Sequence, residues 1–137
     1  MVSTGILLAL GALLLFGGWA VAGGFATRSV TAVNAVFLSY VAGIVVAGSY
    51  VLVARRPIVG TPTDVAWALA SGAFLAGGSI AFYAALTRGS MAIVSAIAAL
   101  YFVVPVFVGV FYLDTALSAT NVAGLGLAVV AVVLIAM

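Results

Sequence analysis

Residues 85–134 read ALTRGSMAIVSAIAALYFVVPVFVGVFYLDTALSATNVAGLGLAVVAVVL and contain the long apolar segment 91–113 and all but the last residue of a second one, 119–135. A short polar turn around Asp114 and Ser118 separates them. Each segment is about 20 residues long and holds no charge, which is the length a helix needs to cross a bilayer core of about 30 Å. Both segments are therefore predicted to span a membrane.

The composition of the whole chain agrees with a membrane protein. Of its 137 residues, 68% are hydrophobic and 4% are charged, compared with about 45–50% and 25% in soluble domains. The charged side chains all fall in gaps between apolar runs: Arg28, Arg55, Arg56, Asp64, Arg88 and Asp114. Four scattered arginines are too few to track the phosphates of a nucleic acid, so nucleic acid is not expected as a partner.

The residues needed for most catalytic and metal chemistry are absent from the sequence. There is no cysteine and no histidine, which leaves no thiol nucleophile and no zinc ligand of the usual kinds. The two carboxylates both lie at predicted membrane edges. We therefore expect neither an enzyme nor a bound cofactor or metal.

The same alternation of apolar run and polar turn extends over the full sequence and predicts five spans. They cover about 4–26, 30–54, 65–87, 91–113 and 119–137, in one domain over residues 1–137. The triplet 20–22 resembles a signal-peptidase site, but no basic residue precedes Arg28 and the apolar stretch is longer than a signal core. We expect the first segment to remain as a span. The prediction is an all-α integral membrane protein that crosses the cell membrane several times.

The ends of the predicted helices carry recognisable signals. Thr63 or Asp64 is expected to cap the third span, and Ser118 the fifth, because a side-chain oxygen can accept the free amides of a first turn. The second span is expected to end at residues 55–57, where Arg55 and Arg56 face the negative end of the helix dipole and Pro57 prevents continuation.

A few polar or aromatic side chains inside the spans are candidates to line a substrate path. They are Trp19, Asn34, Ser79, Tyr83, Ser95 and Tyr101. Ser79 and Tyr83 are four residues apart, so they share one helix face. Trp19 has an alternative interpretation as a packing or membrane-interface residue, and each of the others, taken alone, also fits a structural role.

Two further features concern helix shape and packing. Pro105 should kink the fourth span, because proline removes one backbone hydrogen bond and frees the carbonyl of Tyr101. A simple bend accommodated by packing is the alternative. Small residues spaced four apart let helix backbones approach closely in lipid, which makes these glycines packing candidates: Gly24, Gly43, Gly72 and Gly124.

The order and spacing of residues in the opening stretch resemble one repeat of the EamA family in the drug/metabolite transporter superfamily. The matching positions are Leu86, Gly89, Ser95, Leu100, Pro105, Gly109, Leu113, Asp114, Leu117, Ser118, Asn121 and Gly124. Asp114 stands where the family usually has Glu, and Asn121 where it usually has Gln. The second span also lacks the basic residue that many members carry.

The resemblance implies a transporter of a small metabolite or drug-like solute. Typical members join two five-helix repeats of opposite orientation, whereas this chain shows one repeat, so an inverted homodimer with alternating access is expected. Two arginines fall on each side of the membrane, and the positive-inside rule then favours neither orientation. The alternative is a partner half, or a packing subunit of a membrane complex, with one fixed orientation.

The spans contain no ionisable group of the kind that couples transport to protons or sodium. A proton antiport mechanism of the small multidrug resistance type is therefore disfavoured. Facilitated exchange or diffusion of a neutral, zwitterionic or amphipathic solute fits the residues better.

Overall fold

The computed structural model describes residues 3–55 and 57–137, and every regular element in this part of the chain is helical. Five helical stretches are long and apolar enough to cross a membrane. The predicted all-helical fold with five spans is thus confirmed. The chain divides into two compact units, residues 1–88 and 89–137, which are described separately.

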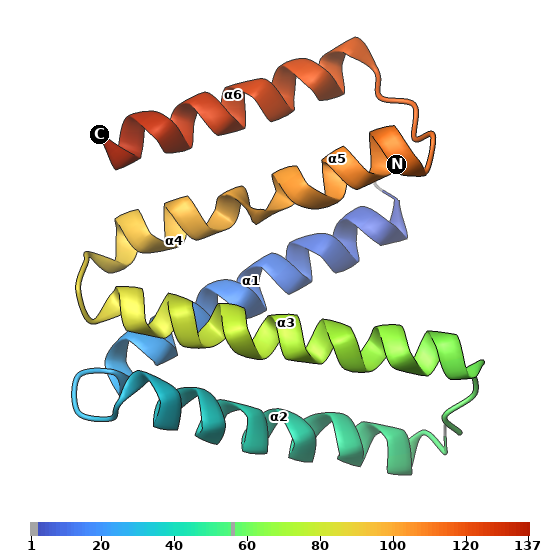
Figure 1. The fold of residues 1–137 in the computed structure, drawn as a ribbon, viewed down its shortest axis with the longest axis vertical. Helices are drawn as coiled ribbons and strands as arrows, with labels where there is room; N and C mark the ends of the chain where they lie inside the picture. The colour runs from blue at the N-terminus through green and yellow to red at the C-terminus, as the bar shows by residue number, and fades with distance from the viewer. Residues whose placement is uncertain (1–2, 56) are drawn as a thin grey trace. The chain divides into compact units, whose positions relative to one another are not determined.

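The first unit holds three helices: α1 (Thr4–Ala26), α2 (Ala32–Val53) and α3 (Pro62–Leu86). A hydroxyl side chain caps the start of each one, because Ser3, Thr31 and Thr61 accept a hydrogen bond from the amide three residues later. In Figure 1 these helices are coloured from blue to green, and α2 and α3 run antiparallel.

The start of α3 differs from the predicted start. The cap is Thr61, and the expected cap at Thr63 or Asp64 was wrong. Asp64 occupies the third helical position, and its Oδ2 accepts a hydrogen bond from the Thr61 amide at 2.9 Å, while Thr61 Oγ1 accepts from the Asp64 amide at 3.2 Å. Pro62 fits the first helical position, where its missing N–H has no helical partner in any case. The helix therefore begins three residues earlier than predicted.

The end of α2 falls at Val53, followed by Ala54 as its cap. Arg55 then adopts a left-handed backbone with φ of 47°, a conformation that ends a helix. The expected role of Arg56 at this helix end lies outside the described residues.

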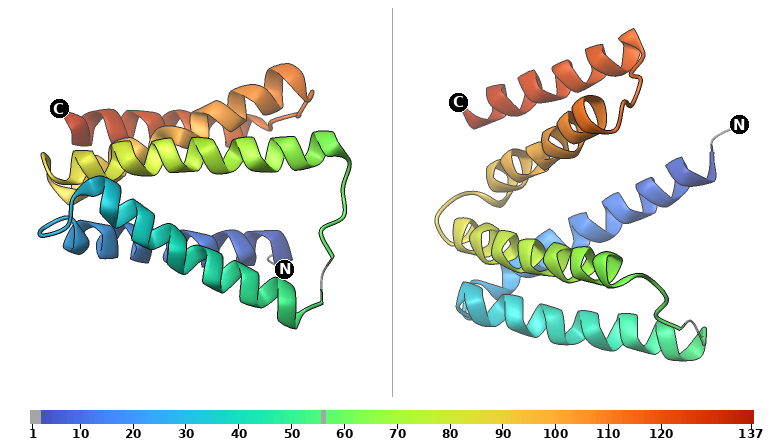
Figure 2. Two further views of the ribbon diagram at one scale, coloured as in Figure 1. Left: turned by 60° about the horizontal axis from the view of Figure 1, so that its bottom comes forward. Right: turned by 45° about the vertical axis from the view of Figure 1, so that its right-hand side comes forward.

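The core of the first unit lies at one end of the α2–α3 pair. Ala35, Val36 and Tyr83 are its buried hydrophobic residues, and Trp19 and Phe82 pack against them. Trp19 lies toward the C-terminal end of α1, and Phe82 and Tyr83 lie toward the C-terminal end of α3. Ala35 and Val36 lie toward the N-terminal end of α2. From this end, α2 and α3 diverge toward the loop that joins them (Figure 2, left).

The second unit contains α4 (Met91–Ala99), a 3-10 turn (Leu100–Phe102), α5 (Val103–Tyr112) and α6 (Ala119–Ala136). The first three form one continuous run of 22 residues, so the predicted fourth span is a helix interrupted by a tighter turn. Helix α6 begins at the expected cap, where Ser118 Oγ accepts from the Asn121 amide at 3.2 Å. It then returns alongside α4.

The turn between α5 and α6 depends on Asp114. Its φ of 49° is left-handed, a conformation that Asp and Asn tolerate better than most side chains. The Thr115 amide then donates to the Gly109 carbonyl at 2.9 Å, which satisfies one free carbonyl of the helix end. The acidic residue therefore has a backbone role at this turn.

We predict that Thr61→Ala lowers the free energy of unfolding by about 1 kcal/mol, because Thr61 Oγ1 no longer accepts from the Asp64 amide or donates to Asp64 Oδ2. Thermal unfolding in detergent, followed by circular dichroism, measures the change. Thr63→Ala is the matched control and should change stability much less. Equal effects of the two substitutions would contradict the assigned cap.

Candidate functional site

Two hydrogen bonds between hydroxyl groups join α2 to α3. Tyr40 Oη and Ser79 Oγ are 3.0 Å apart, and Ser39 Oγ and Tyr83 Oη are 3.3 Å apart. Ser79 is 3% exposed and Tyr83 is 1% exposed. Buried hydroxyls without partners are costly in an apolar environment, so these two pairs fix which faces of the helices meet. The shared face predicted for Ser79 and Tyr83 is the contact face.

An aromatic cluster brings α1 against the same region. The Trp19 ring stacks on both Phe82 and Tyr83, with centroids 5.2 Å apart in each case and interplanar angles of 20° and 29°. Phe82 and Tyr83 are consecutive residues of α3, so Trp19 contacts two neighbouring rings. Stacked aromatic pairs of this kind add to the stabilisation gained from burial alone.

The backbone of α1 comes very close to Tyr83 at Gly23. A Cβ atom at this position would overlap the Cζ, Cε1 and Oη atoms of the tyrosine ring. Gly23 is buried, and only a residue without a side chain fits here. The close approach sets the distance between α1 and α3.

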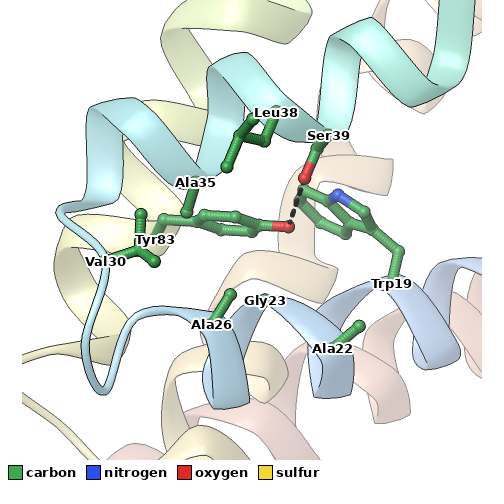
Figure 3. Close-up of a pocket in the computed structure, with 9 residues that line it drawn as sticks. All are labelled: Trp19, Ala22, Gly23, Ala26, Val30, Ala35, Leu38, Ser39 and Tyr83. Atoms are coloured by element: carbon green, nitrogen blue, oxygen red, sulfur yellow. Dashed lines mark hydrogen bonds between the residues drawn. The ribbon is translucent and has the colours of Figure 1, made fainter.

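A cavity of about 190 Å³ lies beside this cluster (Figure 3). The residues that line it come from all three helices and from the α1–α2 turn. They are Trp19, Ala22, Gly23, Ala26, Val30, Ala35, Leu38, Ser39 and Tyr83. None of these described lining residues is charged, and the polar side-chain groups among them are the hydroxyls of Ser39 and Tyr83 and the indole N–H of Trp19. Figure 3 shows the tyrosine hydroxyl directed toward Ser39 and the Trp19 ring.

The cavity is displaced from the middle of the helices toward one end. Trp19 precedes the end of α1 at Ala26 by about 10 Å, and Tyr83 precedes the end of α3 at Leu86 by about 5 Å, at 1.5 Å per residue. The midpoint of α1, which has 23 residues, is about 17 Å from its end. The cavity therefore sits nearer to one end of the three-helix unit.

The structure brings together three of the six predicted path residues. Trp19, Ser79 and Tyr83 form the cluster, and Trp19 and Tyr83 line the cavity. Asn34 lies exposed in the first turn of α2. Ser95 is half-buried in α4, and Tyr101 is 69% exposed in the 3-10 turn of the second unit. The part these three play in a substrate path stays a prediction.

Pro105, the residue predicted to kink the fourth span, stands in the first turn of α5, directly after the 3-10 turn that interrupts the span.

The four glycines predicted to pack helices together differ in their surroundings. A Cβ at Gly43, Gly72 or Gly124 would meet no described atom within 4 Å. These three glycines therefore face away from the neighbours within their own units, and their packing role stays a prediction for contacts beyond them. Gly24 is half-buried, and its carbonyl accepts from Thr27 Oγ1 at 3.3 Å.

Sequence reasoning missed Ser39 and Tyr40 as site residues, although both are hydroxyl groups within the second span. The signal was ambiguous, because Ser49 and Tyr50 repeat the same pair ten residues later, and Tyr50 is 69% exposed. It also missed Gly23, which has the neighbouring Gly24 as an equal candidate. Only the rotation of each helix about its axis distinguishes these residues.

Five apolar spans define an integral membrane protein, and its first unit holds a partly open cavity walled by aromatic and small side chains. The model of the EamA-like transporter family matches residues 3–137, and the chain belongs to this family. The match confirms the resemblance noted in the sequence and corresponds to a single repeat of the family, whose members are membrane transporters of small solutes. No curated protein and no solved structure matches the chain.

We predict that Gly23→Ala destabilises the first unit by about 1–3 kcal/mol, because the added methyl group displaces the Tyr83 ring. Unfolding in detergent measures this loss. Gly18→Ala is the matched control on the same helix, since its Cβ would meet no described atom within 4 Å. Alanine favours helix by up to about 1 kcal/mol over glycine, so the control should be neutral or stabilising. A stabilising Gly23→Ala would contradict the close approach.

A double-mutant cycle of Tyr40→Phe and Ser79→Ala should give a coupling energy of about 0.6 kcal/mol, the size typical of hydrogen bonds between membrane helices. The coupling energy is obtained from the free energies of unfolding of both single variants and the double variant. Ser71→Ala replaces Ser79→Ala in the control cycle, since Ser71 bonds the Ala68 carbonyl of its own helix. Strict additivity in the Tyr40–Ser79 cycle would show that the pair does not hold the helices together.

Proposed function

We propose that the protein moves a small neutral or amphipathic solute across a cell membrane, as an inverted homodimer with alternating access. The observation that carries the proposal is the cavity bounded by Trp19, Ser39 and Tyr83 in a chain of the EamA-like transporter family. Small-molecule sites are concave and mostly apolar, with a few polar groups that orient the ligand. The cavity has this character.

The arrangement of arginines supports the inverted dimer. Arg28 follows α1 and Arg88 follows α3, so these two lie on one side of a membrane that the helices cross in turn. Arg55 and, in the sequence, Arg56 follow α2 and belong to the other side. Orientation is set by Lys/Arg asymmetry between loops, and this chain has none. Two copies inserted in opposite directions would supply the inverted pair of repeats on which alternating access depends.

The position of the carboxylates supports passive movement over ion coupling. Asp64 belongs to the cap of α3, and Asp114 forms the turn after α5. Neither lies among the described residues that line the cavity. Coupling to protons commonly uses an ionisable group within the membrane. We therefore propose exchange or facilitated diffusion driven by the gradient of the solute itself.

Cysteine labelling tests the orientation. The chain has no cysteine, so one Cys at Ser29 and, separately, one at Gly60 report the two sides of the membrane. Intact cells are treated with a membrane-impermeant thiol reagent, and labelling is compared with that after permeabilisation. Both positions should label to about half of the permeabilised maximum if the two orientations are equally populated.

A Cys at Val46, near the middle of α2, is the control and should stay unlabelled in both conditions. Labelling at only one of the two loop positions would overturn the inverted homodimer. It would favour the second candidate, a subunit that pairs in one fixed orientation with a different membrane protein.

A further inference from the structure

We infer that the cavity of the first unit binds an uncharged solute with a single aromatic ring and one hydrogen-bonding group, such as a phenol. This inference rests on the proposed transport function and specifies its substrate class. Three properties of the cavity support it: its volume, the composition of its walls and the few polar groups that can hydrogen-bond a ligand.

The volume is sufficient for about one ring. The cavity measures about 190 Å³, and an engineered, enclosed protein cavity of about 150 Å³ is known to hold benzene. A ring with one small substituent fits the additional space. Because the cavity is partly open, a larger substituent would extend beyond the lining residues.

The walls favour a flat apolar molecule. The Trp19 ring and the Tyr83 ring on which it stacks form part of the lining, and Ala22, Ala26 and Ala35 contribute small side chains. An aromatic ligand can make stacking or edge contacts with these rings. An aliphatic ligand of equal size would gain less from the indole.

Ser39 is the hydroxyl that can hydrogen-bond the ligand, and the indole N–H of Trp19 is a further donor in the lining. Its hydroxyl and that of Tyr83 hold two protons between them, and one is used in the bond that joins the two oxygens at 3.3 Å. The other proton and the free lone pairs remain for a ligand. Tyr83 is 1% exposed, whereas Ser39 is half-buried. Ser39 therefore meets the ligand, and Tyr83 positions its hydroxyl.

The lining also selects against ions. A buried charge needs an opposite charge or several hydrogen bonds to replace its water, and none of the described lining residues supplies a charge. The indole face attracts cations only modestly. Neutral phenols are thus expected to bind, while anions and cations of the same size are not.

Tryptophan fluorescence provides the test, because the two tryptophans occupy different surroundings. Trp67→Phe leaves Trp19 as the sole tryptophan, beside the cavity. In the purified protein near pH 7, 4-bromophenol should quench Trp19 with a saturable curve. Trp19→Phe leaves Trp67, which is 71% exposed, and its quenching should rise without saturation as the probe partitions into detergent. That variant is the matched control.

Two further comparisons test separately the hydrogen bond from Ser39 to the ligand and the preference for an uncharged ligand. Ser39→Ala in the Trp19-only protein should weaken the binding of 4-bromophenol about fivefold, the effect of one neutral hydrogen bond. The affinity for bromobenzene, which lacks the hydroxyl, should stay unchanged, and this result would show that the variant is folded. The anion 4-bromobenzoate and the ammonium form of 4-bromobenzylamine should give only unsaturable quenching.

Each contrary result overturns a stated part of the inference. Saturable quenching by either ion as strong as that by 4-bromophenol would overturn the neutral class and leave the cavity as a substrate site. No saturable quenching by 4-bromophenol would overturn the phenol-sized ligand. Neither result affects the orientation measured by labelling at Ser29 and Gly60, so failure of this inference and failure of the inverted dimer are distinguishable.

Discussion

The arrangement of the first unit depends on one side chain, the tyrosine at position 83. Its hydroxyl needs a partner in an apolar environment, and Ser39 of α2 provides it. Its ring needs space, and Gly23 of α1 provides that. Because Ser39 and Gly23 lie on either side of the Tyr83 side chain (Figure 3), Tyr83 fixes α1 and α2 relative to α3 at once. The cavity is what remains where Trp19, Ser39 and Tyr83 meet without filling the space between them.

Much of the fold follows from lengths and composition alone. The five spans were predictable because an uncharged run of about 20 residues has one stable form in a bilayer, a helix with its backbone bonds satisfied internally. The start of α3 was harder, since Thr61, Thr63 and Asp64 all carry capping oxygens. Pro62 decides between them, because it fits only the first turn of a helix.

The site was predictable only in part, and the reason is helix rotation. Ser79 and Tyr83 are four residues apart, so their common face follows from the helical repeat. Which residues of α2 they meet does not follow, because Ser39–Tyr40 and Ser49–Tyr50 offer the same chemistry. Amphipathic pattern usually resolves such choices, but these helices are apolar on every side and expose large hydrophobic residues all around.

The off-centre cavity has a consequence for any inverted pair of copies. A two-fold axis in the membrane plane would relate the two cavities and displace one toward each surface by the same distance. The two cavities would be chemically identical, so a solute would meet the same affinity whichever side it entered from. The assembly would then have no built-in direction, and net flow would follow the concentration difference alone.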